Sequence, residues 1–304
     1  MTLQKAPLAT AGLVLGLLGL GNLLKDLSLV FTATCGFLAL LIWLYLLYSM
    51  ISDPKSVKEQ MQNPLISSVF TTFFMSGFLG VTYLKLFFGG ASFVGSLIRP
   101  LWILCFISIV CHMLIFSAKY LRHFSLDSVF PSWTVLYIGV AIAGLTAPIS
   151  GWFGVGQFTI MYGFVATCLV LPFIFKRLKQ SPLPSVVKPN TATICAPFSL
   201  VTAAYALSFP QPNPLVMSGL LALAQLFYFY IVLQLPTLLN RPFSPVFSAF
   251  TFPLVISATA LKNGMAVLGL AGVWDWLLFG EMLLASVIVI GVLIGYIRFF
   301  LTKQ

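Results

Sequence analysis

The chain has 304 residues, of which 60% are hydrophobic and only 7% are charged, and its mean hydropathy is +1.05. An ordinary soluble domain carries about 25% charged residues, so this composition excludes a water-soluble globule. The formal net charge of +10 comes from basic residues placed between apolar segments, which indicates membrane topology and not a nucleic-acid partner. We therefore expect an all-α integral membrane protein in which residues 1–304 form one transmembrane domain, in contact with membrane lipid.

Ten apolar segments follow one another along the chain, and five of them begin at or near a proline. The intervals between these prolines are 57, 67, 58 and 56 residues, about the length of a helical hairpin with two spans. Proline suits the first turn of a helix, where its missing N–H has no partner. The pattern predicts ten transmembrane helices as five quasi-repeated hairpins. The prolines are Pro7, Pro64, Pro131, Pro189 and Pro245, and the expected spans are 6–24, 27–50, 64–84, 95–117, 130–150, 154–175, 190–209, 213–235, 245–263 and 272–297.

The basic residues are distributed unequally between the two sides of this arrangement. If the first segment starts in the cytoplasm, twelve Lys and Arg residues lie in internal segments and four lie in external ones. Such a positive-inside bias sets the orientation and predicts that both termini are cytoplasmic, in agreement with an even number of spans. We expect the protein in a bacterial inner (plasma) membrane.

The odd-numbered spans differ from the even-numbered ones in composition. They hold 20 Ser and Thr residues against 11 in the even spans, and further prolines at Pro148, Pro197 and Pro253. Interior prolines free backbone groups, which lipid tolerates only where neighbours or water satisfy them. These features favour a central pore lined by kinked odd helices, although Ser, Thr and Gly also serve close helix packing. The candidate lining and kink residues are Thr10, Gly16, Ser68, Thr72, Ser76, Thr134, Pro197, Thr202, Thr251 and Pro253.

Acidic residues are absent from the odd spans. Cation channels and proton- or sodium-coupled carriers generally place carboxylates along their path, so the proposed lining favours a small inorganic or organic anion, or a neutral solute. Glu281 lies on an even span and is either satisfied by a neighbouring helix or a coupling group. His112 is likewise either a hydrogen-bonded packing residue or a proton relay.

Catalytic and metal-binding patterns are not found in the sequence. The five cysteines fall inside expected spans, and their spacing does not resemble a metal site. A membrane hydrolase or transferase needs a nucleophile–base pair, a carboxylate cluster or a metal set, which two separated histidines and one intramembrane glutamate do not supply. We expect no metal, no cofactor and no enzyme activity.

Three stretches resemble the tellurite-resistance/dicarboxylate transporter (TDT) family, which includes the bacterial tellurite-resistance membrane protein and the plant guard-cell slow anion channels. They are Pro7-Leu8-Ala9-Thr10 with Gly16-Leu17-Leu18-Gly19-Leu20, then Ala196-Pro197 with Val201 and Ala203-Ala204-Tyr205, and finally Ala249-Phe250-Thr251-Phe252-Pro253. The resemblance implies ten helices around a central pore, a homotrimer with one pore per subunit, and a pore-blocking phenylalanine at Phe252.

Two functions therefore remain open. The first is an anion channel or passive anion transporter whose central pore is occluded by Phe252. The second is a proton-coupled dicarboxylate or sulfite carrier that uses Glu281 or His112 as its proton site. A membrane protein with no transport role is a third, weaker reading.

Overall fold

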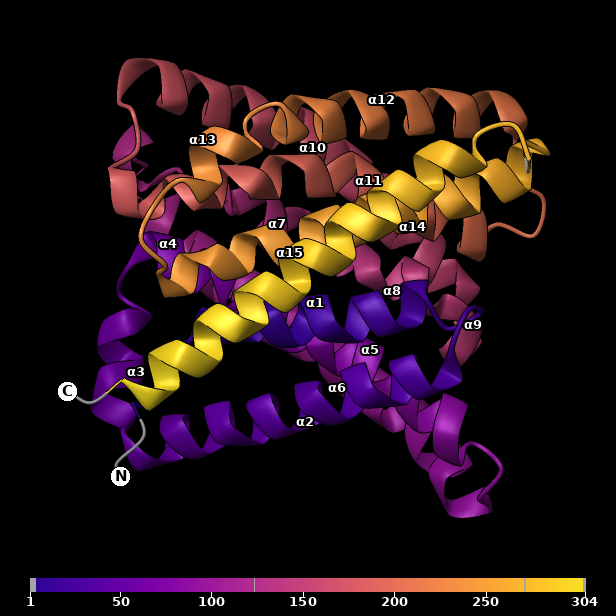
Figure 1. The fold of residues 1–304 in the computed structure, drawn as a ribbon, viewed down its shortest axis with the longest axis horizontal. Helices are drawn as coiled ribbons and strands as arrows, with labels where there is room; N and C mark the ends of the chain where they lie inside the picture. The colour runs from indigo at the N-terminus through magenta and orange to yellow at the C-terminus, as the bar shows by residue number, and fades with distance from the viewer. Residues whose placement is uncertain (1–3, 123, 271, 303–304) are drawn as a thin grey trace.

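The computed structural model describes residues 4–122, 124–270 and 272–302, and these residues form helices and connections with no strand among them (Figure 1). Eight helical segments are long and apolar enough to cross a membrane, and two shorter apolar helical segments, Thr10–Leu23 and Trp133–Leu145, accompany them. The all-helical membrane protein expected from the composition is thereby confirmed. The eight segments are Leu29–Ser52, Pro64–Phe88, Ser92–Tyr120, Phe153–Gln180, Ser185–Ser208, Pro214–Val232, Pro245–Leu268 and Asp275–Leu301.

The helices fall into an inner and an outer set. In the inner long segments, 67–89% of the most apolar stretch is buried, against 22–39% in the outer ones. The inner set is α1 (Thr10–Leu23), α4 (Pro64–Val69) with α5 (Thr71–Phe88), α7 (Trp133–Ile138) with η2 (Gly139–Ala141), α8 (Ile142–Leu145) and α9 (Ala147–Ser150), η3 (Ser185–Cys195) with α11 (Ala196–Ser208), and η4 (Pro245–Phe250) with α14 (Thr251–Leu268). The outer set is α2 (Leu29–Ser52), α6 (Ser92–Tyr120), α10 (Phe153–Gln180), α12 (Pro214–Val232) and α15 (Asp275–Leu301).

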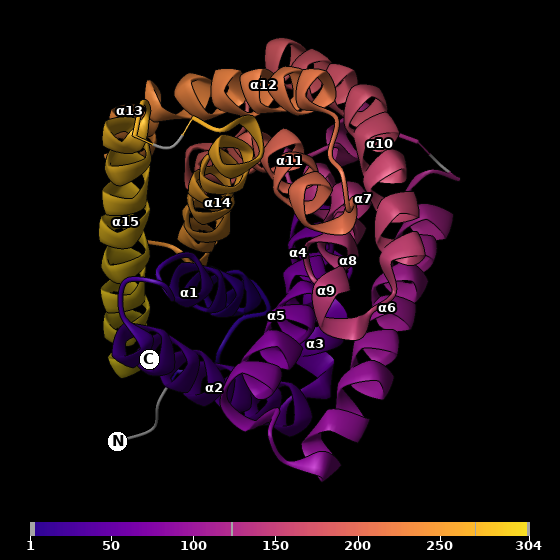
Figure 2. The same ribbon diagram turned by 90° about the vertical axis from the view of Figure 1, so that its right-hand side faces the viewer.

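Figure 2 looks along the helices and shows the inner set as a ring enclosed by the outer helices. Each inner segment contacts the next one, in the order α1, α5, α8, α11, α14 and back to α1. The outer helices expose large apolar side chains to the surroundings, as a lipid-facing surface requires. Three short elements, α3 (Pro54–Gln60), η1 (Leu126–Ser128) and α13 (Leu235–Leu239), lie in connections between the long helices.

Four of the five inner segments are interrupted, and each of these four contains at least one proline. Pro64 begins α4, but Pro189 lies within the 3₁₀ segment η3 and Pro245 begins the 3₁₀ segment η4. The sequence had predicted α-helices starting at these two prolines. The tighter 3₁₀ turn accommodates a residue without an N–H near the beginning of the segment and places the regular α-helix further along.

The prolines expected to kink the inner helices mark the points at which an α-helix resumes. Pro148 and Pro197 lie in the first turns of α9 and α11, and Pro253 is the third residue of α14. At these positions the proline breaks no hydrogen bond within a helix, because the first N–H groups of a helix have no partner inside it.

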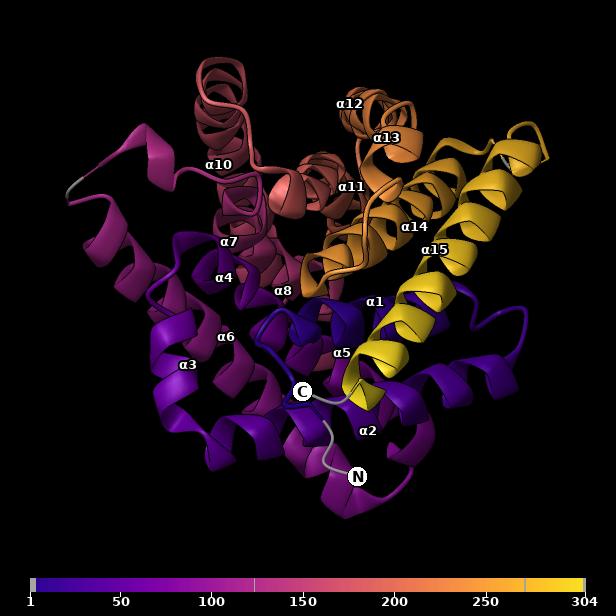
Figure 3. The same ribbon diagram turned by 60° about the vertical axis from the view of Figure 1, so that its left-hand side comes forward.

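Polar contacts tie the two ends of the helical bundle. At one end the backbone N–H of Gln4 donates to the carbonyl of Phe300 at 3.0 Å, so α15 ends beside the start of the described chain (Figure 3). Lys5 pairs with Asp53 at 3.0 Å near the same end. At the opposite end Lys262 of α14 pairs with Asp26, in the connection between α1 and α2, at 2.7 Å.

Candidate functional site

A small cavity of about 30 Å³ lies within the inner ring. On this measure about 10–15 Å³ is enough to hold one water molecule, so the cavity has room for only a few. Every inner segment contributes to its wall, for example through Gly12 of α1, Thr72 of α5, Thr134 of α7, Pro197 of α11 and Phe252 of α14. No charged side chain is among the lining residues, and most of the others are apolar.

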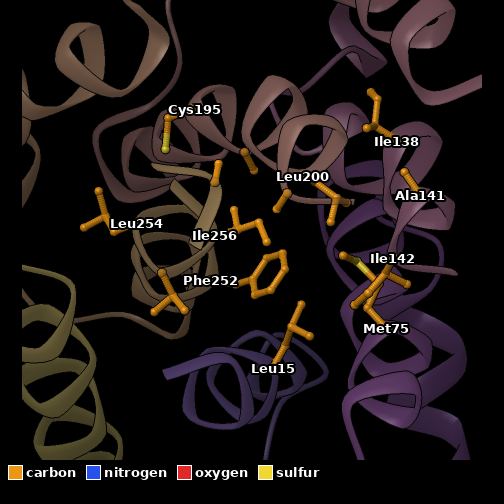
Figure 4. Packing of buried hydrophobic residues seen from close by; sticks show 14 of the residues in the cluster. Leu15, Met75, Ile138, Ala141, Ile142, Cys195, Leu200, Phe252, Leu254 and Ile256 are labelled. Carbon is orange, nitrogen blue, oxygen red and sulfur yellow. The ribbon is translucent and has the colours of Figure 1, made fainter. Parts of the chain in front are cut away.

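Phe252 is the largest side chain on this cavity. Figure 4 shows its ring extending from α14 into the space between Leu15, Met75 and Leu200, which belong to three other inner helices. The residue is 5% exposed. A Cβ atom added to Gly19 would lie 3.4 Å from the ring carbon Cδ2, so α1 presents a bare backbone to one side of the ring. The ring therefore fills the centre of the inner ring of helices.

The backbone that carries Phe252 is fixed to α1. The Thr251 hydroxyl donates to the carbonyl of Gly12 at 2.9 Å and lies 2.7 Å from the carbonyl of Ser248. A Cβ atom on Gly16 would overlap the Thr251 side chain, so a glycine at this position allows the two helices to meet closely.

Five of the residues predicted to line a pore meet at the cavity: Thr72, Thr134, Pro197, Phe252 and Pro253. The structure thus brings together prediction sites from four separate parts of the chain. The remaining candidates lie elsewhere in the inner set. Thr10 and Thr202 are buried in α1 and α11, Ser68 in α4, Ser76 in α5, and Gly16 and Thr251 at the contact between α1 and α14.

The hydroxyls of the inner set mostly bind backbone carbonyls. Thr72 and Thr134, both on the cavity, donate to the carbonyls of Val69 and Pro131, three residues earlier, at 2.8 Å. Ser68 and Ser76 do the same, whereas Thr202 donates to the carbonyl of Phe198, four residues earlier. These hydroxyls therefore satisfy carbonyls near the interruptions, and their hydrogens are already engaged.

Ser248 is a cavity residue that the sequence did not single out. It lies four residues before Phe252, on the 3₁₀ segment η4, and its Oγ is buried with no hydrogen-bond partner among the described residues. A spacing of four residues places two side chains on the same face of a helix. The spacing from Phe252 is therefore the sequence signal that could have identified Ser248. Its hydroxyl lies on the cavity wall and does not bind a backbone carbonyl among the described residues.

The two titratable candidates lie away from the cavity. The Nε2 atom of His112 is 2.9 Å from the carbonyl of Ser67, which can only accept, so this nitrogen carries the hydrogen. The His112 ring also packs against Phe70 and Phe74. Glu281 of α15 is 1% exposed, and neither of its carboxylate oxygens has a hydrogen-bond partner among the described residues.

Comparisons with known proteins bear on this arrangement. A comparison with curated proteins finds no match. The profile of the SLAC1 family, described as voltage-dependent anion channel, matches residues 5–297 and so covers nearly the whole chain. This match confirms the resemblance to the TDT family and assigns the protein to a group of anion channels and transporters in the membrane. The chain belongs to the SLAC1 family of voltage-dependent anion channels.

Proposed function

We propose that the protein conducts a small anion along the axis of the inner ring and that Phe252 occludes this path. The observation that carries the proposal is the position of the Phe252 ring on a cavity to which all five inner segments contribute. In this arrangement the ten helical segments form five hairpins, with one member of each hairpin inside and one outside. An anion is favoured because no carboxylate lines the cavity among the described residues.

Conduction requires the Phe252 ring to move, because the remaining space of about 30 Å³ is too small for a hydrated anion to pass. The ring is attached to a backbone that Thr251 holds against α1, so rotation of the side chain opens the path without separating these helices. An anion at this level meets the Ser248 hydroxyl and otherwise mostly apolar walls. Selectivity then depends mainly on the free energy of removing water from the anion, and weakly hydrated anions pass more easily.

The test is the anion current of Phe252→Ala, recorded in planar bilayers or oocytes. Phe198→Ala is the matched control, because Phe198 is also a buried phenylalanine with 5% exposure but packs against Phe164 and Phe227 and not on the cavity. We expect a current at least tenfold above wild type in Phe252→Ala and wild-type current in Phe198→Ala. Equal currents in both correctly inserted variants would remove the gate assignment.

Orientation and assembly form part of the same proposal. Both termini face the cytoplasm of a bacterial cell, as the twelve-to-four distribution of basic residues suggests, and the proximity of Gln4 to Phe300 agrees with an even number of crossings. The subunits form a homotrimer with one pore each, as the family resemblance implies. A C-terminal reporter that is active only in the cytoplasm tests the orientation, and mass measurement of the detergent complex tests the trimer.

The alternative is a proton-coupled dicarboxylate or sulfite carrier. Its supporting observation is Glu281, a carboxyl group buried among membrane helices without a basic partner among the described residues. This function predicts uptake driven by a pH gradient and lost in Glu281→Gln or His112→Ala. Flux that follows the anion gradient alone, in liposomes with and without a pH gradient, would eliminate it.

A further inference from the structure

Two basic side chains from different helices bind the end of the inner segment that contains α9. The Nζ atom of Lys85, in the last turn of α5, lies 3.5 and 3.3 Å from the carbonyl oxygens of Pro148 and Ile149, to which it donates. Arg99 of α6 donates from Nε to the carbonyl of Ser150 at 3.1 Å. The last C=O groups of a helix have no partner inside it, so these three consecutive carbonyls need outside donors. One short stretch of backbone thereby holds two positive charges close together.

The turn after α9 brings the Arg99 guanidinium against the backbone. Gly151 has a φ of +77°, and a Cβ atom built on it would lie 3.5 Å from Nη2 of Arg99. A guanidinium has five N–H donors, and only the one on Nε has an acceptor among the described residues. Lys85 and Arg99 are both exposed to the surroundings. Their remaining donors and their charges are therefore open to solutes.

Neither charge has an acidic partner in the part of the chain that the structure describes. The ion pairs found there all involve other basic residues. At this end of the molecule Asp26 is paired with Lys262 at 2.7 Å, and Asp275 accepts from the backbone N–H of Gly272 at 3.0 Å. The charged side chains of this end, Lys25, Lys85, Arg99 and Lys262 against Asp26 and Asp275, leave a net charge of four minus two, or +2.

This end is the one at which the inner helices finish, and it faces the viewer in Figure 2. Lys262 of α14 also donates there to the carbonyl of Leu23, the last residue of α1, at 3.2 Å. The carboxyl end of a helix is equivalent to about half a negative charge, so a path bounded by such ends would repel an anion. Lys85 and Arg99 lie on this rim, because the carbonyls that they bind belong to an inner segment. Two unbalanced positive charges outweigh the repulsion at α9.

We propose that Lys85 and Arg99 concentrate small anions at this end of the inner ring and so increase the rate at which anions enter the path. The inference rests on the proposed anion conduction. The two charges act through the solvent, so every small anion is enriched and no single one is selected. The enrichment declines as salt is added, because the Debye length falls from about 30 Å at 0.01 M to about 3 Å at 1 M. The Phe252 gate decides whether the path is open, and these two residues decide how often an anion arrives.

Trp152 reports on anions near these charges without any current. It follows Gly151, and 44% of the residue is exposed. Its fluorescence in the detergent-purified protein, taken as the difference from Trp152→Phe, is quenched with iodide and separately with neutral acrylamide at about 0.01 M salt. We expect the ratio of iodide to acrylamide quenching to fall about twofold in Lys85→Gln and in Arg99→Gln, and to persist in Arg99→Lys, which keeps the charge. Lys55→Gln, in α3 at the opposite end, is the control and keeps the ratio.

The effect on entry is measured as single-channel conductance in symmetrical chloride, with every variant made in the Phe252→Ala background. We expect Lys85→Gln and Arg99→Gln to lower the conductance about twofold at about 0.01 M chloride and to leave it unchanged at about 1 M. A loss of equal size at both concentrations would indicate that the two side chains only hold the end of α9, and would overturn the proposal.

A quenching ratio that is the same in wild type and in both glutamine variants would overturn the proposal as well. Absence of current in Phe252→Ala would contradict the proposed conduction instead. The quenching ratio would then still decide whether anions collect at Lys85 and Arg99.

Discussion

The Thr251 hydroxyl donates to the carbonyl of Gly12 across the closest contact between α1 and α14. This bond links residues 239 positions apart and lies directly before Phe252 in the chain. Gly12, Gly16 and Gly19 form the face of α1 that receives Ser248, Thr251 and the Phe252 ring. The support of the proposed gate is therefore a contact between the first and the last inner helices.

This contact predicts a strong effect of a single methyl group. Gly16→Ala places a Cβ atom on the Thr251 side chain, and such overpacking of a buried contact costs about 1–3 kcal/mol. Gly80→Ala in α5 is the control, because nothing lies within 4 Å of its added Cβ atom. We expect a melting temperature lowered by several degrees in the first variant and unchanged in the second. Identical melting curves of the two variants would mean that α1 can move away from α14 without loss of stability.

The Ser248 hydroxyl on the cavity leads to a second prediction. In a Phe252→Ala background, Ser248→Ala removes a hydroxyl that does not bind a backbone carbonyl, and should lower the anion conductance severalfold, since a desolvated anion gains from each donor it meets. Thr134→Ala removes a hydroxyl on the same cavity whose hydrogen is engaged by the Pro131 carbonyl, and should change conductance less. Single-channel recordings of the double variants compare the two. A larger loss in Thr134→Ala would contradict the role of Ser248.

A third prediction concerns the contact between α4 and the start of α7. The hydroxyl oxygens of Ser68 and Ser132 are 2.6 Å apart and both side chains are fully buried. Hydrogen bonds between membrane helices contribute about 0.6 kcal/mol on average in double-mutant cycles. Unfolding of Ser68→Ala, Ser132→Ala and the double variant in mixed micelles should give a coupling free energy of about this size. Ser68→Ala combined with Ser76→Ala should be additive, because these side chains do not contact each other.

The ion pair between Lys262 and Asp26 predicts a pH dependence. The hydrogen bond from Lys262 lowers the pKa of Asp26 below its usual 3.8, against a smaller opposing effect of burial. The pair therefore stabilises the folded protein above the usual pKa, and this contribution is lost as the pH falls through the lowered pKa. Since the Asp26 side chain is 63% exposed, the effect is below about 1 kcal/mol. Melting curves of Asp26→Asn should lie slightly below wild type at pH 7 and approach it as the pH falls below 3.8; a difference that grows at low pH would exclude this origin.

Much of the architecture was accessible from the sequence because it depends on periodicity and composition. The charge content identified a membrane protein, and the surplus of Ser and Thr in alternate spans agrees with the greater burial of those spans. The prolines Pro148, Pro197 and Pro253, predicted as kinks inside helices, lie in the first turns of α9, α11 and α14, where a residue without an N–H costs no hydrogen bond.

The cavity wall was only partly predictable, because a hydroxyl-rich segment does not reveal which way each side chain points. Thr72 and Thr134 reach the cavity, whereas Ser68 faces Ser132 of a neighbouring helix. Which side of a broken helix faces the axis depends on the 3₁₀ turns at η3 and η4, and these change the angular position of every following residue. The side chains beside Glu281, Gln225 and Ser257, come from two other helices, α12 and α14, a juxtaposition that no local pattern contains.

The closed order of the inner helices limits how the path can widen. Because α1 contacts both α5 and α14, and α11 completes the circuit through α8, the circumference is fixed by five interhelical contacts. A uniform increase in the radius of the inner ring would lengthen all of these contacts together. One of them is the close contact at Gly16, and dispersion attraction falls steeply with separation. A change in one side-chain torsion at Phe252 leaves the circumference unaltered. In the proposed gating by Phe252, opening is therefore a local change of one aromatic ring's rotamer and leaves the contacts between the inner helices in place.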